Sequence, residues 1–515
     1  MCGKKGWRGE VAWTRFDSMP IIAVEGCCHG ELDSIYASVA LAEERSNCKV
    51  DALLICGDFQ AVRNPADLAT MACPAKYRSM QSFYKYYSGE KVAPVLTIFI
   101  GGNHEASSHL CALPFGGWVA PNIFYLGHAG VINVGGVRIA GLSGIYKERD
   151  YATGHHERPP FSEDNMRSFY HVRELDVLRL LQLRRPLDIF LSHDWPQHIA
   201  HHGDVQTLVR RKSFLKAEID DGSLGSPPAM QLLQRLQPRY WFSAHLHVKF
   251  AAVVRHPPPA AAAVGARGGG DDGACTRFLS LSKCLPDQDF LQLLSVEGNA
   301  NSASSGGGGA PLLTYDAEWI AILRSTGHLH STLPGRLPLD LGSVAAASGG
   351  RTDFSPTVDE LRDVHARASA AGLPESLPVP SNFEISATPY REGDSMHAQQ
   401  APFAESNQTV AFLRTFGLDE NFRTQRGATH HAPRHARAPA SAPVPTPRLV
   451  LPAPVSDSLM PQAPPAAPTF PTLPVPPSQM VASTAPPPTI TAASTASAGA
   501  ARPPLLDEEI DLDDE

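Results

Sequence analysis

Apolar runs of strand length recur along the first half of the chain, and each gives way abruptly to polar residues. Five such runs lie at residues 21–24, 52–56, 95–100, 187–191 and 240–244. Short apolar runs bounded by Gly, Asn or Ser are typical of buried strands. We therefore expect five strands whose ends carry polar side chains.

Amphipathic segments separate these runs. Residues 31–45 have helical spacing, with Leu32, Ile35 and Val39 on one face. Residues 131–139 read as a hairpin around two consecutive glycines. Strands that alternate with amphipathic helices predict an α+β fold, a layered β-sandwich flanked by helices.

Low-complexity stretches interrupt the second half of the chain. Residues 257–273 are rich in Pro, Ala and Gly, and residues 299–310 in Ser and Gly, so we expect both to loop out. The apolar segments 278–281, 290–296 and 312–323 are then expected to be strands that complete the same sheet system.

These shifts in composition define the expected domains. A smaller C-terminal domain is predicted from helical segments near residues 358–371 and 410–418. The Pro- and Ala-rich end of the chain cannot bury enough apolar surface to offset its conformational entropy, so we expect disorder there. The expected parts are a first domain at 19–256, an insertion at 257–273, the rest of the sheet system at 274–330, the C-terminal domain at 356–422 and a disordered tail at 423–515.

The chain of 515 residues has a net charge of −8, and residues 507–515 account for most of it with seven acidic side chains. The rest is almost neutral, so charge neither supports nor excludes binding to nucleic acid. The acidic end is either a site for a protein partner or a solubilising terminus.

The cysteines and the apolar runs indicate which cellular compartment to expect. Nine cysteines show no CxxC spacing, and the first 18 residues contain no apolar segment of signal-peptide type. We therefore expect a reducing compartment without disulfides. Apolar runs fall short of the roughly 20 residues that a membrane span needs, so no membrane partner is expected.

The five strand ends carry side chains with metal-ligand chemistry. Residues two apart at a strand end point to the same side, so Cys27 and His29 can converge on one point. Asp58 can bridge two cations, and Asn103 offers a neutral oxygen. The predicted metal ligands are Cys27, His29, Asp58, Asn103, His193, His245 and His247.

His104 directly follows the predicted ligand Asn103. A side chain beside the metals but not bound to them suits a general acid that protonates a leaving oxygen. We therefore assign His104 as the catalytic residue.

The order and type of these motifs resemble the calcineurin-like metallophosphoesterases. The matching motifs are Gly57-Asp58, Gly102-Asn103-His104-Glu105, Ser192-His193-Asp194 and His245-Leu246-His247. Cys27 stands where that family normally has Asp, and this departure resembles the RNA lariat debranching enzymes in particular. The resemblance of this chain to those enzymes extends over roughly residues 19–418.

The resemblance implies a calcineurin-like fold in which residues 356–422 form the C-terminal domain of lariat debranching enzymes. It implies hydrolysis of the 2′,5′-phosphodiester at the branch point of excised intron lariats, which gives linear RNA for turnover in mRNA processing. The implied partner is branched intron RNA, and the implied location is the nucleus.

Cys27 bears on the choice of metal. Thiolate is softer than carboxylate, so Fe(2+) or Zn(2+) is favoured over Mg(2+), with Mn(2+) suited to an oxygen-rich position. Whether one or two divalent ions bind per chain stays open. The alternative is that Cys27 is a buried thiol next to the metal.

Residues 143–173 combine aromatic and basic side chains, as surfaces that bind single-stranded RNA do. The alternative is a polar surface loop whose aromatic rings pack underneath. The candidate RNA contacts are Tyr146, Lys147, Arg149, Tyr170 and His171.

Two other functions fit the same residues. The first is a generic metallophosphoesterase that acts on phosphoproteins or small nucleotides. The second is a non-catalytic scaffold with a degenerate metal centre, which the Asp-to-Cys departure suggests. The intact remaining ligands and His104 argue against the scaffold.

Overall fold

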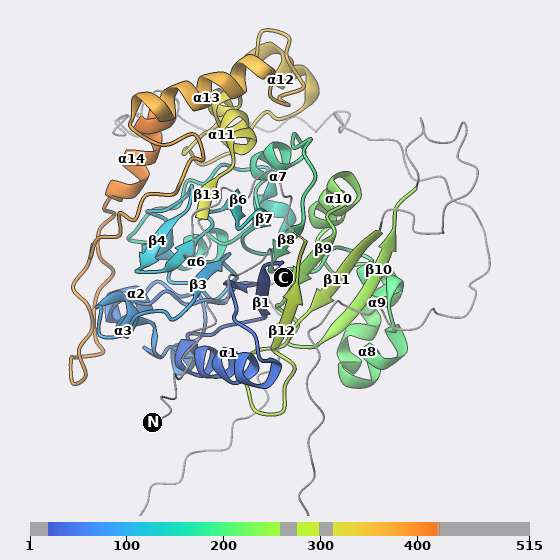
Figure 1. Ribbon diagram of the computed structural model, residues 1–515, viewed down its shortest axis with the longest axis vertical. Helices are drawn as coiled ribbons and strands as arrows, with labels where there is room; N and C mark the ends of the chain where they lie inside the picture. Colours follow the sequence, from blue (N-terminus) through green and yellow to red (C-terminus); the bar gives the residue numbers. More distant parts are fainter. Residues whose placement is uncertain (1–18, 258–274, 298–312, 420–421, 423–515) are drawn as a thin grey trace, which may run out of the picture. The chain divides into compact units, whose positions relative to one another are not determined.

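The computed structural model of the protein describes residues 19–257, 275–297, 313–419 and 422 (Figure 1). The predictions for the disordered tail, for its acidic end and for nearly all of the insertion at 257–273 fall outside these residues.

The first of two sheets has six strands in the order β12-β1-β2-β3-β5-β4. Strands β1, β2, β3 and β5 run parallel, and β12 and β4 are antiparallel at the edges. The strands are β1 (Ile21–Glu25), β2 (Ala52–Ile55), β3 (Leu96–Phe99), β4 (Gly117–Ala120), β5 (Ile123–Tyr125) and β12 (Leu291–Ser295).

The second sheet has seven strands in the order β10-β11-β9-β8-β7-β6-β13. Its parallel centre is β7-β8-β9-β11. The strands are β6 (Ala129–Val134), β7 (Val137–Leu142), β8 (Ile189–Ser192), β9 (Tyr240–Ser243), β10 (Phe250–Arg255), β11 (Cys275–Ser280) and β13 (Leu313–Tyr315).

The two sheets share one apolar core, as the predicted sandwich requires. Their inward-facing side chains belong to one fully buried cluster that includes Val24, Leu54, Ile98, Ile139, Leu191 and Phe242. The other face of the first sheet packs against helix α1 (Leu32–Ser46), where Ile35 and Val39 join Leu53 in a second cluster. The helical spacing of residues 31–45 therefore predicted the correct element.

Most helices lie in the connections between strands (Figure 1). They are α2 (Pro65–Leu68), α3 (Phe83–Tyr87), α4 (Ser107–Leu110), α5 (Glu148–Tyr151), α6 (Glu163–Ser168), α7 (Glu174–Leu180), α8 (Val205–Arg211), α9 (Lys216–Asp221) and α10 (Pro227–Leu236).

The C-terminal region adds helices α11 (Ala317–Ser325), α12 (Leu341–Ala347), α13 (Val358–Ala370) and α14 (Asn407–Phe416). Helix α11 packs on α13, and α13 on α14. Helix α14 reaches the first sheet, where the Gln408 amide bonds both the N–H and the C=O of Trp118 at 2.8 Å. The domain boundary at residue 356 stays a prediction.

Two sequence expectations need comment. The hairpin at residues 131–139 is confirmed as β6-β7. The strand expected over residues 312–323 is wrong beyond Tyr315, because Asp316 caps a helix by accepting a hydrogen bond from the Trp319 N–H at 3.0 Å. No helix among the described residues combines the length and the apolar character that crossing a bilayer demands.

Candidate metal centre

The predicted ligands come together at the carboxyl ends of five strands, three from the first sheet and two from the second. The ends of β1, β2 and β3 supply Cys27 and His29, Asp58, and Asn103, while β8 and β9 supply His193 and the His245/His247 pair. Loops at the carboxyl ends of parallel strands are a common place for sites.

The first group of donors gathers around one oxygen of Asp58. The donor atoms of Cys27, His29, Asp58 and His247 all lie within 4.8 Å of one another. His29 Nε2 is 3.3 Å from His247 Nε2 and 3.6 Å from Asp58 Oδ2. One thiol, two imidazoles and a carboxylate at this spacing fit a divalent cation.

The second group faces the other oxygen of Asp58. His193 Nε2 lies 3.3 Å from Asp58 Oδ1 and 3.1 Å from Asn103 Oδ1. The ring of His245 is 5.0 Å from the ring of His193, centroid to centroid. The two carboxylate oxygens thus point to two separate sets of donors, as a carboxylate shared by two ions would require.

Unusual backbone turns direct these side chains inward. His29, Asp58, His245 and His247 adopt φ values of +44°, +48°, +65° and +48°. Positive φ is rare for residues with a Cβ, and strained residues of this kind cluster at functional sites.

Burial and charge set the protonation of the donors. Burial raises the pKa of Asp58, but the neighbouring His193, His104 and His29 outweigh it and hold the pKa well below its usual range. Burial lowers the pKa of His245 to about 3 and that of His247 to about 2. Both imidazoles are therefore neutral at neutral pH, and each keeps a lone pair for a cation.

His104 stands beside the ligands on the open side of the centre. Its Nδ1 is 3.8 Å from Asp58 Oδ2, and its backbone N–H donates to Asp58 Oδ1 at 2.9 Å. The side chain is 31% exposed, whereas that of Asp58 is 2% exposed. A substrate can therefore reach His104 while the carboxylate stays shielded.

Two supporting residues were not assigned from the sequence. The buried Glu105 carboxylate accepts backbone hydrogen bonds from Phe59 at 2.7 Å, Gln60 at 2.9 Å and Gly102 at 3.0 Å. Gln60 Nε2 is 3.2 Å from His29 Nδ1. Glu105 ties the loop after β2 to the loop after β3, and its place directly after His104 was the available signal.

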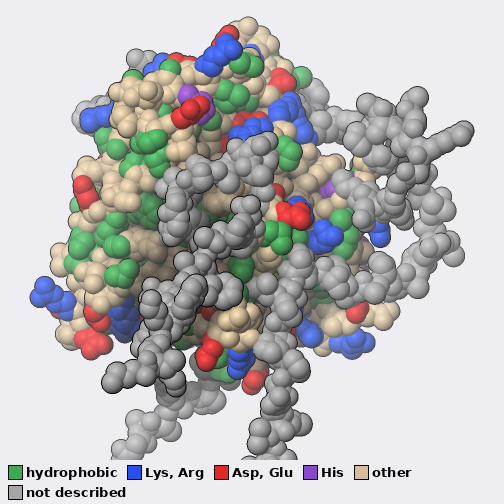
Figure 2. Space-filling view, viewed as in Figure 1, with side chains coloured by type: hydrophobic (Ala, Val, Ile, Leu, Met, Phe, Trp, Pro, Cys, Tyr) green, Lys and Arg blue, Asp and Glu red, His purple; other side chains and the backbone are tan. Residues whose placement is uncertain are grey.

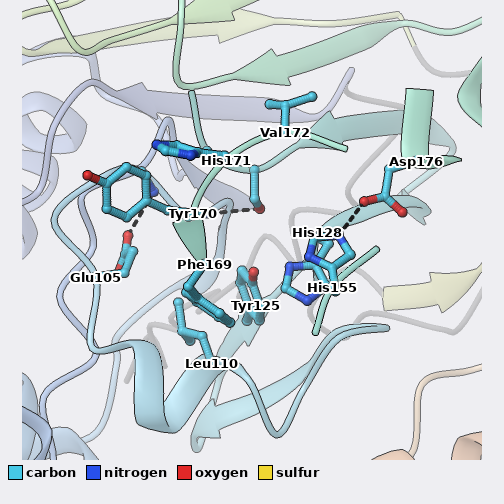
Figure 3. Close-up of a pocket in the computed structure, with 14 residues that line it drawn as sticks. Glu105, Leu110, Tyr125, His128, His155, Phe169, Tyr170, His171, Val172 and Asp176 are labelled. Carbon is cyan, nitrogen blue, oxygen red and sulfur yellow. Dashed lines mark hydrogen bonds and ion pairs between the residues drawn. The ribbon is translucent and has the colours of Figure 1, made fainter. Parts of the chain in front are cut away.

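The candidate RNA contacts differ in exposure. The Arg149 side chain is 62% exposed, and Tyr146 and Lys147 are half-buried. Tyr170 and His171 are buried, and Figure 3 shows both at the wall of a small pocket that also includes Glu105. Tyr170 and His171 therefore pack inward, and contact of any of the five residues with RNA stays a prediction.

Comparison with known proteins assigns both halves of the described chain. Residues 20–249 match the family model for calcineurin-like phosphoesterases. Residues 273–421 match the model for the C-terminal domain of lariat debranching enzymes.

Individual relatives extend the match over most of the chain. A human lariat debranching enzyme is 49% identical over 414 residues, which cover 80% of this chain and 71% of the relative. An Arabidopsis thaliana lariat debranching enzyme is 54% identical over 397 residues, which cover 77% of this chain and 86% of the relative. The chain belongs to the lariat debranching enzyme family.

Lariat debranching enzymes of this kind are calcineurin-like metallophosphoesterases, so the chain is a hydrolase that uses divalent metal ions. The cluster of thiol, imidazole and carboxylate donors at Asp58 fits such ions. The predicted fold class and family are thereby confirmed.

Proposed function

We propose that the protein hydrolyses the 2′,5′-phosphodiester bond at the branch point of intron lariats and so releases linear RNA. The observation that carries the proposal is the pair of donor groups on the two oxygens of Asp58, with Cys27 in one group and His104 alongside. The family of the chain gives the class of substrate.

We further propose that the ions are Fe(2+), Zn(2+) or Mn(2+), one or two per chain. Cys27 would favour Fe(2+) or Zn(2+) in the group with His29 and His247, because thiolate and imidazole are softer donors than oxygen. Asn103 adds an amide oxygen to the group with His193, which suits Mn(2+) as well. When bound, the ions would offset the negative charge on the phosphate and assist ionisation of a water.

The chain's own residues divide the remaining work. His104 would donate a proton to the departing oxygen, for which its exposed position beside Asp58 is suitable. Gln60 would orient His29 through its hydrogen bond to Nδ1. Lys147 and Arg149 would meet RNA phosphates. They lie at the start of residues 143–173, which we call the recognition segment. Intron RNA is made in the nucleus, so we propose that location.

The test is debranching of a synthetic branched RNA by metal-stripped protein to which Fe(2+), Zn(2+) or Mn(2+) is added singly. We expect cleavage of the 2′,5′ bond, little action on nitrophenyl phosphate, and a turnover lowered about a hundredfold or more by His104→Ala, the scale of general acid catalysis. The exposed His397→Ala is the matched control. Equal efficiency on both substrates would indicate a generic phosphoesterase, and full turnover by His104→Ala would remove its role as the acid.

A further inference from the structure

A second cavity lies away from the metal ligands, where the phosphoesterase region meets the C-terminal region. Its wall combines several side chains from between residues 111 and 179 with Trp319, Leu323 and Leu337. The two parts also meet through an antiparallel bridge between Thr153 and Arg336. Cavities at such junctions are common places for ligands.

The wall of this cavity is rich in basic residue types for a buried surface. Three arginines and three histidines line it, against one carboxylate, Asp176. By contrast, basic and acidic side chains are interspersed over the molecular face in Figure 2. Burial lowers the pKa of His128, His155 and His330 well below the usual range, so the positive charge of the wall comes from Arg158, Arg173 and Arg179.

Two of the guanidinium groups keep unused donors. Arg179 Nε donates to Thr326 Oγ1 at 3.0 Å, and its Nη1 lies 3.5 Å from Asp176 Oδ1, but its Nη2 has no partner within the described part of the chain. Arg173 bonds Glu157 through Nη2 at 2.5 Å, while its Nε is likewise without a partner there. Both side chains are at least 96% buried, being 4% and 1% exposed.

Unmet donors on buried charges are costly, so they indicate a missing acceptor. Burial lowers the pKa of Arg179 to about 10, because Asp176 compensates it incompletely. Asp176 is shared, since its Oδ2 lies 2.6 Å from His155 Nε2. Figure 3 shows His155 stacked face to face on His128 beside Asp176, with ring centroids 3.7 Å apart.

We propose that this cavity binds a small phosphate-type oxyanion, held by the free donors of Arg179 and Arg173. A planar guanidinium fork matches the oxygens of phosphate. The cavity volume is about 30 Å³, whereas a single water needs roughly 10–15 Å³. It therefore exceeds the space of a single water and admits a small polyatomic anion.

The site would join the recognition segment to the C-terminal region. Arg173 Nη1 donates to the Asp150 carbonyl at 2.7 Å, within helix α5 of that segment. Arg179 Cζ lies 5.6 Å from the ring centre of Phe422, which is fully buried. An anion between the two arginines would thus hold both parts in place and raise thermal stability.

The experiment is calorimetric titration of inorganic phosphate into full-length holoenzyme and into an Asp58→Asn variant, which removes phosphate bound at the metal centre. We expect Asp58→Asn to keep one phosphate site. Adding Arg179→Lys, which preserves the charge but removes the fork, should weaken that site about tenfold or more. The exposed Arg184→Lys is the matched control and should leave it unchanged.

Arg158→Gln provides a second test if Arg179→Lys does not fold, because Arg158 is only half-buried and also lines the cavity. It should weaken phosphate binding, whereas Arg184→Gln should not. A 5′-phosphorylated dinucleotide serves as the second ligand, and the enclosed site should prefer free phosphate. Absence of a site in Asp58→Asn, equal affinity in the cavity variants and their controls, or binding of the dinucleotide alone would overturn the proposal.

Discussion

The backbone N–H of His245 donates a hydrogen bond to the Sγ of Cys27 at 3.2 Å, although 218 positions separate the two residues. The bond joins the loop after β1, in the first sheet, to the loop after β9, in the second. Cys27 is fully buried. Its sulfur is therefore both one of the four candidate metal donors gathered at Asp58 and an acceptor that fixes the His245 loop.

Replacing Cys27 by Asp tests the first of these actions. An all-oxygen donor at this position should shift the centre from Zn(2+) and Fe(2+) toward Mn(2+), because carboxylate is the harder ligand. We expect the ratio of bound Zn to bound Mn to fall about tenfold or more. Replacing a residue that only hydrogen-bonds to a metal ligand already changes metal affinity by about this factor. Elemental analysis after loading from an equimolar mixture measures the ratio. Cys48→Ser, at a half-exposed thiol in another loop, is the control, and an unchanged ratio in Cys27→Asp would exclude Cys27 as a ligand.

Two adjacent glycines give a matched test of the geometry at Asp58. A Cβ at Gly102 would collide with Asp58 and with the ring of His193, whereas a Cβ at Gly101 would make ordinary contacts of 3.6 Å or more. Gly102→Ala should therefore lose most of the bound metal and turnover, and Gly101→Ala should retain both. Metal content and debranching rate are the measurements. Equal loss in both variants would show that the loop, and not the clash, is responsible.

The grouping of the candidate metal ligands could be predicted because each follows an apolar run directly in the sequence. Cys27, Asp58 and His193 come within three residues of a strand end, so recognising the strand also located the ligand. The role of Glu105 in joining the loops after β2 and β3 could not be predicted from strand ends. Its three partners are backbone groups on two loops, and backbone donors leave no trace in residue type.

The recognition segment was harder to predict for a related reason. Aromatic and basic residues serve equally well on a surface or in a buried polar network, and sequence spacing does not separate the two. His171 illustrates this, since it is buried with its Nδ1 2.6 Å from Asp150 Oδ2. The helix α11 was missed because its apolar residues 319–323 resemble a strand until the Asp316 cap is recognised.

A buried ion pair connects the second sheet to the C-terminal region. Arg138 on β7 bonds Asp316 and Glu318 at the start of α11, each at 2.8 Å. Arg138→Gln would leave buried Glu318 without this cation and Asp316 with only the exposed Arg185, whose Nη1 is 3.5 Å from Asp316 Oδ2. We expect a loss of about 3–5 kcal/mol in the free energy of unfolding. Arg184→Gln, which breaks the exposed pair with Asp353, should cost about 1 kcal/mol or less. Urea unfolding of both variants measures the difference, and similar losses would contradict the assigned role.

Acid should lower the free energy of unfolding through His171, which lies in the recognition segment. Burial lowers the pKa of His171 to about 4, although Asp150 opposes the shift. As the pH falls below about 6.5, the ordinary value, the unfolded chain takes up a proton that folded His171 does not accept until about pH 4. The free energy of unfolding therefore decreases as the pH falls from about 6.5 to about 4. Above about pH 6.5, His171 is neutral in both states and does not affect stability.

His171→Asn isolates this contribution, because an amide can still donate to Asp150 but does not titrate. Between about pH 7.5 and 5.5, wild type should lose about 1 kcal/mol more stability than the variant. Other buried histidines, such as His128 and His155, titrate in both proteins and cancel in the comparison. The exposed His397→Asn should keep the wild-type slope. Identical slopes in wild type and His171→Asn would mean that the pKa of His171 is the same in the folded and the unfolded chain. A smaller loss in wild type than in the variant would mean that His171 is protonated in the fold, and its bond to Asp150 would then be an ion pair.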